Sequence, residues 1–138
     1  MNIEDFIKQN NVDYSSNRIA EQDISIMEIL LGVSFGKQLR QYITQYGYLG
    51  FEYVELFGIN GRQGTSSDMI QQTQYLHKYF KKTLPYIALE DQGDGDYYLL
   101  DQNDTVYRFL SSKDEIICQD IQLFDYILKR FSEVKGDI

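Results

Sequence analysis

The hydrophobic pattern of the chain switches between two periods, and this switch constrains the fold more than any other feature. In the first third, apolar residues recur three and four positions apart, as at Ile24, Met27 and Leu31. From residue 50 to residue 59 they alternate, and the last third alternates again before a closing helical series that ends at Phe131. The longer spacing is typical of a helix and the alternation is typical of a strand. The pattern therefore predicts helices, one strand, one helix, three or four strands and a final helix.

Local signals predict where these elements begin and end. Gly32 and Gly47 are expected to stop the second and third helices, because glycine readily adopts the left-handed conformation that ends a helix. Asn17 is the expected N-cap of the second helix. Thr65, with Asp68 three residues later, forms a capping-box pattern for the next helix. The expected helices cover about residues 3–9, 18–31, 34–45, 66–80 and 123–131, and the expected strands about 50–59, 86–89, 97–100, 106–110 and 116–118.

The length and the continuous patterning predict one α+β domain. The chain has 138 residues, which is short for two independent cores. Apolar patterning continues from Ile3 to Phe131 without a linker, an internal repeat or a low-complexity segment. We therefore expect a single domain over residues 1–138, with a mainly antiparallel, twisted sheet of about four to six strands flanked by helices.

The acidic composition excludes several classes of partner. The chain has 21 acidic and 13 basic residues and a formal net charge of −8. Nucleic acid and anionic membranes bind to basic patches, so neither is expected, whereas a basic protein partner fits. No apolar run reaches the roughly 18 residues of a membrane helix, and the acidic N-terminus has no signal-peptide core. Cys118, the single cysteine, cannot form an internal disulfide, and together these features predict a cytoplasmic protein.

The strongest local feature is an acidic segment from residue 90 to residue 104. It contains six carboxylates and no basic residue, with Tyr97 and Tyr98 among them. One interpretation is an anionic patch that docks on the basic active site of a nuclease, which must bind phosphates. The other is that Asp and Gly form turns whose side chains are simply solvated. The six carboxylates belong to Glu90, Asp91, Asp94, Asp96, Asp101 and Asp104.

Two glycine-rich stretches do not match known ligand-binding loops. Gly58, Gly61 and Gly64 lack the Gly-Lys-Ser/Thr ending of a P-loop, so we interpret this stretch as a flexible loop in which Arg62 is an exposed contact residue. An EF-hand loop needs oxygen ligands at its first, third and fifth positions. Counted from Asp91, the third and fifth positions are glycine, so no calcium site is expected.

The remaining candidates do not assemble into a catalytic or metal site. His77, the only histidine, is expected to be solvated on the polar side of its helix, and Cys118 is expected to be a buried, inert thiol. A dyad of these two has no orienting residue, and one His with one Cys cannot supply a closed zinc site. Glu52 and Glu55 are expected on opposite faces of a strand, which excludes the facing acid pair of a glycosidase. We therefore expect no catalytic residue, no cofactor and no metal.

The sequence contains 12 tyrosines, an unusually high number for this length. Some are expected to pack with their hydroxyl groups at the rim of the core, and others to be exposed, where tyrosine is a good interface anchor. The first group comprises Tyr42, Tyr53, Tyr86 and Tyr98, and the second comprises Tyr46, Tyr48 and Tyr97.

Three strings, in this order, resemble the signatures of the SUKH superfamily. They are an acidic helix start with a Leu-Gly stop and a following Tyr-bearing helix, an acidic Gly-Asp turn between aromatic strands, and a closing helix with Phe-x-Tyr-x-Leu. The residues that carry the resemblance are Glu21, Asp23, Ile24, Glu28, Leu31, Gly32, Val33, Leu39, Tyr42, Ile43, Tyr46 and Gly47, then residues 85–89, 91, 93–98, 101, 106 and 107, and finally residues 124–128. The similarity is strongest over residues 20–131. Phe35-Gly36 stands where Leu-Pro is usual, and Tyr46-Gly47 lacks the usual Asn.

This resemblance implies a protein-binding role. The superfamily takes in the yeast cell-wall-synthesis regulator and many bacterial immunity proteins that neutralise a toxin, often a nuclease or deaminase, encoded beside them. It implies a non-catalytic bacterial immunity protein that occludes a basic toxin domain. We expect the chain to be a monomer or weak homodimer. The alternative is an intracellular scaffold or regulator of the fungal type. The expected contact residues are the six carboxylates of the acidic segment together with Tyr97 and Arg62.

Overall fold

The computed structural model describes residues 1–15, 19–59 and 68–136, and its elements follow the predicted order with a few short additions. The helices are α1 (Ile3–Gln9), α2 (Glu21–Leu31), α3 (Lys37–Gln45), α4 (Met69–Tyr79), the short 3-10 helix η1 (Lys81–Thr83) and α5 (Leu123–Gly136). The strands are β1 (Asp13–Tyr14), β2 (Leu49–Phe51), β3 (Val54–Leu56), β4 (Ile87–Asp91), β5 (Asp96–Leu100), β6 (Thr105–Leu110) and β7 (Glu115–Gln122).

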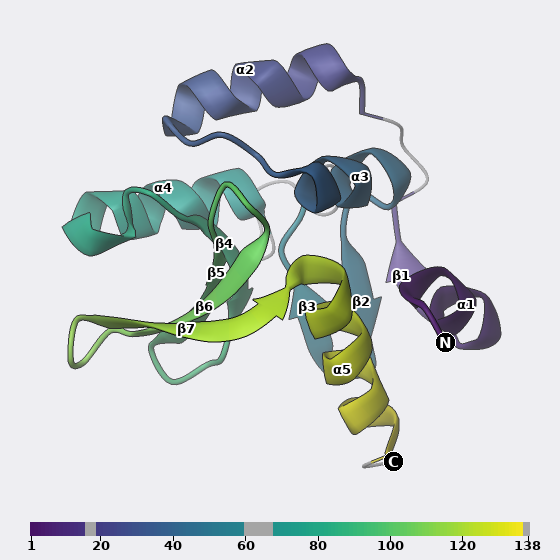
Figure 1. Ribbon diagram of the computed structural model, residues 1–138. Helices are drawn as coiled ribbons and strands as arrows, with labels where there is room; N and C mark the ends of the chain where they lie inside the picture. Colours follow the sequence, from purple (N-terminus) through teal and green to yellow (C-terminus); the bar gives the residue numbers. More distant parts are fainter. Residues whose placement is uncertain (16–18, 60–67, 137–138) are drawn as a thin grey trace.

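The strands of the described residues form two antiparallel sheets (Figure 1). The smaller sheet has the order β1-β2-β3, and the larger has the order β4-β5-β6-β7, in which each strand pairs with the next one in the sequence. A backbone hydrogen bond of 2.7 Å from Phe57 N to Leu89 O connects the segment after β3 to β4. α4 packs on the larger sheet, where Ala88 N donates to Thr73 Oγ1 at 2.9 Å. The α+β class is therefore confirmed, and the larger sheet has four strands.

The single strand expected over residues 50–59 is instead a hairpin, so this prediction was wrong. β2 and β3 pair so that Phe51 lies opposite Val54, and only Glu52 and Tyr53 connect them. Glu52 has a φ of 54°, a left-handed conformation that Gly, Asn and Asp adopt far more readily than Glu. The turn is not visible in the sequence, because both of its residues also fit the alternating pattern of a continuous strand.

Both predicted glycine stops are confirmed. Gly32 has a φ of 70°, and its N–H donates to Glu28 O at the end of α2. Gly47 has a φ of 74° and follows Tyr46, the C-cap of α3. Glycine meets little steric resistance in this conformation, so the sequence places the C-terminal ends of these helices correctly.

The predicted N-terminal ends of α2 and α4 were wrong. The N-cap of α2 is Ala20, without a side-chain hydrogen bond, and Asn17 lies outside the described residues. The N-cap of α4 is Asp68 itself, whose carboxylate accepts two backbone N–H groups of the first turn. Asp68 is therefore the capping residue, and not the third residue of a box that begins at Thr65.

A residue from a distant part of the chain caps the N-terminus of α3. The carboxylate of Asp104, in the turn between β5 and β6, accepts hydrogen bonds from Gln38 N at 2.8 Å and Leu39 N at 2.9 Å. A Cβ at Gly36 would clash with this carboxylate, so glycine is needed for the close approach. α3 consequently begins at Lys37, later than the expected residue 34.

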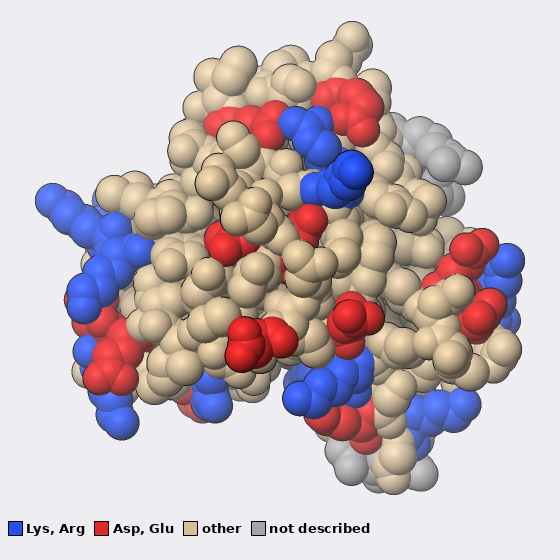
Figure 2. All heavy atoms as spheres, in the orientation of Figure 1, with Lys and Arg blue, Asp and Glu red and all other residues tan. Residues whose placement is uncertain are grey.

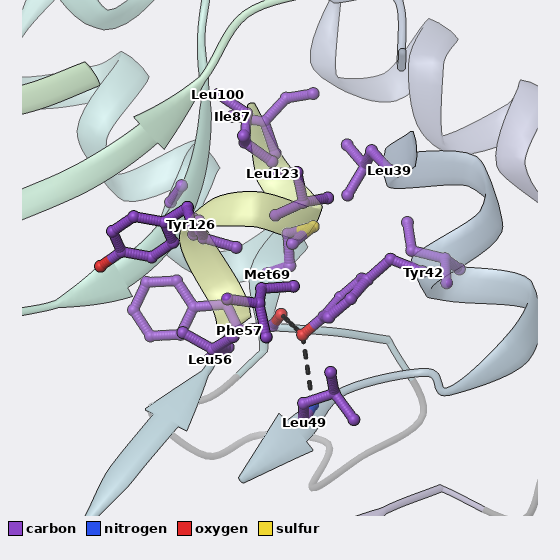
Figure 3. Close-up of a cluster of buried hydrophobic side chains, with 14 of the residues drawn as sticks. Leu39, Tyr42, Leu49, Leu56, Phe57, Met69, Ile87, Leu100, Leu123 and Tyr126 are labelled. Atoms are coloured by element: carbon purple, nitrogen blue, oxygen red, sulfur yellow. Dashed lines mark hydrogen bonds between the residues drawn. The ribbon is translucent and has the colours of Figure 1, made fainter. Parts of the chain in front are cut away.

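Tyr42 of α3 lies at the centre of the core, and its hydroxyl group joins α3 to the smaller sheet (Figure 3). The hydroxyl donates to Phe57 O at 2.7 Å and accepts from Leu49 N at 3.2 Å. The side chain is fully buried, so the predicted position at the rim was wrong. The two hydrogen bonds offset the cost of burying the hydroxyl group.

The exposure of other tyrosines also differs in part from the prediction. Tyr53 was expected at the core rim but is 66% exposed in the β2–β3 turn. Tyr46, Tyr48 and Tyr97 were expected to be exposed but are half-buried. Tyr86 and Tyr98 are half-buried, as a rim position requires.

Cys118 is exposed, so the prediction of a buried thiol was wrong. It lies in β7, which is an edge strand of the larger sheet. No residue of β7 is fully buried. An apolar-looking strand at a sheet edge can remain partly open to water, and its sequence does not distinguish it from an inner strand.

Replacing Asp104 with alanine is expected to lower the free energy of unfolding by about 2–4 kcal/mol, because α3 loses its N-cap and two amide groups lose their acceptor. The matched control is Asp114→Ala. Asp104 and Asp114 have similar φ values, 65° and 52°, but Asp114 lies in an exposed turn and caps no helix. Its loss should stay near 1 kcal/mol, because only the left-handed backbone preference and an exposed ion pair with Lys82 are affected. Urea unfolding followed by circular dichroism measures both losses, and equal losses would contradict the capping role.

Calorimetry of the isolated chain is expected to show one cooperative unfolding transition. The buried residues of both sheets and of the helices belong to one apolar cluster, and cooperative unfolding follows from a shared core. Two separated transitions would contradict the prediction of a single domain.

Candidate partner-binding site

The six carboxylates of the predicted acidic patch do not form one surface. Asp91 and Asp94 lie at the β4–β5 turn, are exposed, and each accept a backbone N–H of that turn. Asp101 and Asp104 lie in the β5–β6 turn, at the opposite end of the sheet, because successive antiparallel strands reverse direction. The carboxylates of the acidic segment therefore lie at both ends of the larger sheet and not on one patch.

Three of the six carboxylates are held by contacts within the larger sheet and α3. Asp104 is 4% exposed and caps α3. Asp96 is half-buried and lies 3.3 Å from Arg108 Nη2. Asp101 accepts the hydroxyl of Tyr107 at 3.0 Å, and burial together with this hydrogen bond raises the pKa of Tyr107 to about 12. These carboxylates stabilise the fold and offer little free surface to a partner.

A cavity of about 470 Å³ opens between the two sheets and α5. Its walls come from the β2–β3 turn, the segment after β3, the β4–β5 turn and α5. Four carboxylates, one guanidinium group and two aromatic rings line it, and we call it the acidic cavity. The charged residues are Glu52, Glu55, Glu90, Asp91 and Arg130, and the aromatic residues are Tyr53 and Phe57.

Glu90 forms the base of the acidic cavity and is only 3% exposed. Its Oε1 accepts from the Tyr126 hydroxyl at 2.6 Å, and its Oε2 accepts from Arg130 Nη2 at 3.1 Å. Burial, followed by the charge and hydrogen bond of Glu90, raises the pKa of Tyr126. Burial by itself lowers the pKa of Arg130. The hydrogen bond and the charge of Glu90 outweigh burial, so the pKa of Arg130 is raised. Glu90 is thus held by two side chains of α5 and is nearly inaccessible, which does not fit the expected role of an exposed contact residue.

Glu52 and Glu55 are the site residues that sequence reasoning missed. The sequence interpretation placed them on opposite faces of one strand, but the turn at residues 52 and 53 brings both to the same cavity. Tyr53 follows Glu52 in this turn, and the centre of the Tyr53 ring lies 6.0 Å from the Arg130 guanidinium. A Gly, Asn or Asp at residues 52 and 53 would have indicated a turn and so this arrangement. Glu and Tyr, which stand there, do not indicate a turn. Arg62, another predicted contact, lies outside the described residues.

The acidic cavity is suited to receive a cationic side chain. Carboxylates form charge-assisted hydrogen bonds with guanidinium and ammonium groups, and aromatic rings attract cations through their faces. A concave wall also excludes part of the water, so each charge interaction is stronger there than on a flat surface. The geometry therefore supports binding of an Arg or Lys from a protein partner.

Other chemistries have less support. Within the described residues, no three His, Cys, Asp or Glu side chains are grouped so that they could hold a metal ion. His77 is half-buried and its Nε2 lies 2.7 Å from Tyr86 O, so the expectation of a solvated side chain was wrong. Among the described residues, no helix has the length and apolar character needed to cross a membrane.

Replacing Tyr126 with phenylalanine is expected to lower the free energy of unfolding near pH 8 by about 1–2 kcal/mol, because Glu90 loses a hydrogen bond. In the folded wild type the pKa of Tyr126 is raised, so the neutral phenol stabilises the fold below about pH 10, and this contribution is lost as the pH rises further. The phenylalanine variant has no phenol at this position, so it does not lose this contribution to stability at high pH. Its free energy of unfolding should fall less steeply above about pH 10, and denaturant unfolding across this range measures the slope. Parallel curves for the two proteins would contradict the assignment.

Comparison with known proteins agrees with the fold. The family model described as SUKH_5, SMI1-KNR4 cell-wall, matches residues 3–129. The match confirms the resemblance seen in the sequence and extends it toward the N-terminus to include α1 and β1. No curated protein matches the chain. Because the family model covers most of the chain, the protein belongs to the SUKH (SMI1-KNR4) family.

Proposed function

We propose that this protein is an immunity protein that binds a basic bacterial toxin domain and blocks it by occlusion. The observation that carries the proposal is the acidic cavity on a chain with a net charge of −8. A nuclease-type toxin presents Lys and Arg to hold phosphates, so an anionic, concave surface complements its active site. The superfamily includes many immunity proteins, and membership in the family supports this role.

The proposed contact surface combines the acidic cavity with the adjoining β4–β5 turn. A basic side chain of the toxin enters the cavity between Glu52 and Asp91, and Asp94 extends the anionic surface beside it. Tyr53, which is 66% exposed, replaces Tyr97 as the aromatic anchor at the rim. Single exposed ion pairs contribute only about 0.2–1 kcal/mol each. The combined field therefore acts mainly on the association rate and its salt dependence.

The proposed mechanism needs no turnover and no cofactor. Occlusion requires one copy of the protein for each toxin domain, and the binding free energy alone keeps substrate out of the active site. The His77 ring is held against a backbone carbonyl, and among the described residues it forms no hydrogen bond with a serine, threonine or cysteine side chain. We accordingly propose that the chain is not an enzyme.

One observation favours a second function. The description of the matching family refers to SMI1-KNR4 and the cell wall, which fits an intracellular scaffold or regulator that recognises an endogenous protein. A neighbouring gene that encodes a toxin with a basic C-terminal domain favours the immunity function. A neighbourhood of housekeeping genes favours the scaffold.

We expect the charge-reversed variant Glu52→Lys, Asp94→Lys to lose protection against the toxin domain encoded by the neighbouring reading frame. Both residues are exposed, and circular dichroism checks that loss of the hydrogen bond from Asp96 N to Asp94 leaves the fold intact. Growth of cells that express the toxin domain, with the wild type or the variant co-expressed, measures protection. Stopped-flow measurements give the association rate, which should fall by about tenfold or more at low salt, with a smaller difference at high salt.

The matched control reverses two exposed carboxylates that do not line the cavity, in the variant Asp23→Lys, Glu115→Lys. It has the same net charge as the test variant, so it separates a local effect from a general loss of anionic character. Equal rates for the test and control variants would exclude the acidic cavity as the interface. A wild-type chain that neither binds nor protects would contradict the immunity function.

A further inference from the structure

The outer side of α2 carries three large aliphatic residues that are open to water. Ile26, Ile29 and Leu30 are 62%, 83% and 59% exposed, whereas Ile24 and Leu31 on the inner side are buried. Apolar residues therefore lie on both sides of this helix. A helix that is apolar all round is normally covered all round, and contiguous exposed aliphatic surface marks an interaction site.

The exposed aliphatic residues form one continuous stripe, because residues three and four apart are neighbours on a helix surface. Leu30 lies one turn after both Ile26 and Met27, and Ile29 lies one turn after Ile26. Met27 is half-buried and packs against the core. We call these four residues the α2 stripe. Figure 2 shows uncharged atoms along the top of the molecule, where α2 lies in Figure 1, and acidic side chains just below them.

An apolar cavity of about 260 Å³ opens beside the α2 stripe. Ile26 and Met27 line it from α2, and Ile19 and Ile59 complete its apolar lining. Asp23 is the one charged side chain among the described residues that line it. A helical stripe with a cavity beside it can anchor one large apolar side chain of a partner, as in interfaces where a helix binds in a groove.

Asp23 gives this site a negative charge without a partner inside the molecule. It lies one turn before the cavity-lining residues of the stripe, is exposed, and forms no salt bridge within the described part of the chain. The other two carboxylates of α2, Glu21 and Glu28, both pair with Arg40 of α3. The helix contains no Lys or Arg. The site is therefore apolar, with one uncompensated anionic group at its edge.

We propose that the α2 stripe binds an amphipathic helix of another protein. An aliphatic or aromatic side chain of that helix enters the cavity, and a Lys or Arg of the same helix lies beside Asp23. The three- and four-residue spacing of the stripe is the spacing that packs against a second helix.

Charge complementarity selects this occupant over two others. Helices that bind membrane surfaces carry Lys and Arg beside their apolar face, and α2 carries none. A second copy of the chain that packed α2 against α2 would bring no basic residue of that helix to Asp23. A basic, amphipathic partner satisfies both the stripe and the carboxylate.

The α2 stripe and the acidic cavity are separate sites. No described residue lines both cavities. In Figure 1, α2 lies at the top of the molecule, whereas α5, which lines the acidic cavity, lies at the bottom. Both sites can therefore be occupied at once, and the inference does not depend on the proposed function.

A synthetic helical peptide of about 18 residues, long enough to form a helix, tests the proposal. It carries Leu three and four positions apart and Lys elsewhere, and fluorescence anisotropy measures its binding. In about 0.5 M salt, general attraction to the acidic chain is screened. Ile26→Gln with Ile29→Gln should then raise the dissociation constant about tenfold or more. Glutamine preserves the helix propensity of α2.

The matched control for the stripe is Leu84→Gln with Ile117→Gln. These two aliphatic residues are 50% and 45% exposed and do not line the cavity beside α2. Both double variants keep the net charge of the wild type, so they differ only in where apolar surface is lost. The control should change the dissociation constant by less than about twofold.

A second peptide, with Glu in place of Lys, tests the role of Asp23 at low salt. The wild type should bind the Lys peptide more tightly than the Glu peptide. Asp23→Lys should reduce this preference about threefold more than Glu115→Lys does. Glu115 is exposed on β7, and the two variants have the same net charge, so the comparison isolates the local effect of Asp23.

Amide chemical shifts in NMR spectra of the wild type give a readout that needs no variant. The Lys peptide in about 0.5 M salt should shift the amides of α2 and leave those of the β4–β5 turn unchanged. Circular dichroism checks the fold of each variant. Toxin binding enters none of these measurements, so this test and that of the proposed function fail independently.

Any one of four outcomes would overturn the proposal. The first is a wild-type chain that does not bind the Lys peptide at high salt, and the second is an equal loss in the stripe variant and its control. The third is binding of phosphatidylcholine vesicles that the stripe variant abolishes, which would assign the stripe to a membrane. The fourth is dimerisation of the wild type, seen by analytical ultracentrifugation, that the stripe variant abolishes.

Discussion

A short chain of hydrogen bonds through Tyr42 and Phe57 links the helical layer to both sheets. The Tyr42 hydroxyl of α3 donates to Phe57 O and accepts from Leu49 N, and Phe57 N donates to Leu89 O of β4. In the part of the chain that the structure describes, the two sheets share no ladder of strand pairs, so this link and the apolar packing around it fix their relative position. The link is costly to break, because each buried polar group left without a partner costs about 1–3 kcal/mol.

The position of the acidic cavity follows from this link. The Phe57 side chain forms part of the cavity wall, and Glu90 directly follows Leu89 at its base. The β2–β3 turn and the β4–β5 turn belong to different sheets, and they line one cavity only because the sheets are held side by side. The site is therefore a product of the contact between two sheets, and neither hairpin could form it alone.

The acidic residues of this chain have two physical roles that composition does not separate. Glu90 and Asp104 are buried and fully engaged, one with Tyr126 and Arg130 and the other with the N-terminus of α3. Burial of a carboxylate is tolerable only with such partners, because desolvation of an unpaired ion costs several kcal/mol. Of the six carboxylates of the acidic segment, only Asp91 and Asp94 are exposed, and both lie at the β4–β5 turn.

The hydrophobic period, the glycine stops and the ordered family signatures determined the α+β class, the order of the main elements and the family. These features depend on local backbone preferences and on the spacing of apolar residues, which a sequence displays directly. The turn at Glu52, the cap that Asp104 provides for α3 and the pairing of Glu90 with Arg130 were decided by the tertiary structure. Each of them depends on groups that are distant in the sequence or on a backbone conformation that the residue type disfavours. The sequence alone therefore showed an acidic protein, but only the tertiary packing of helices and sheets determined which carboxylates hold the fold together and which remain exposed.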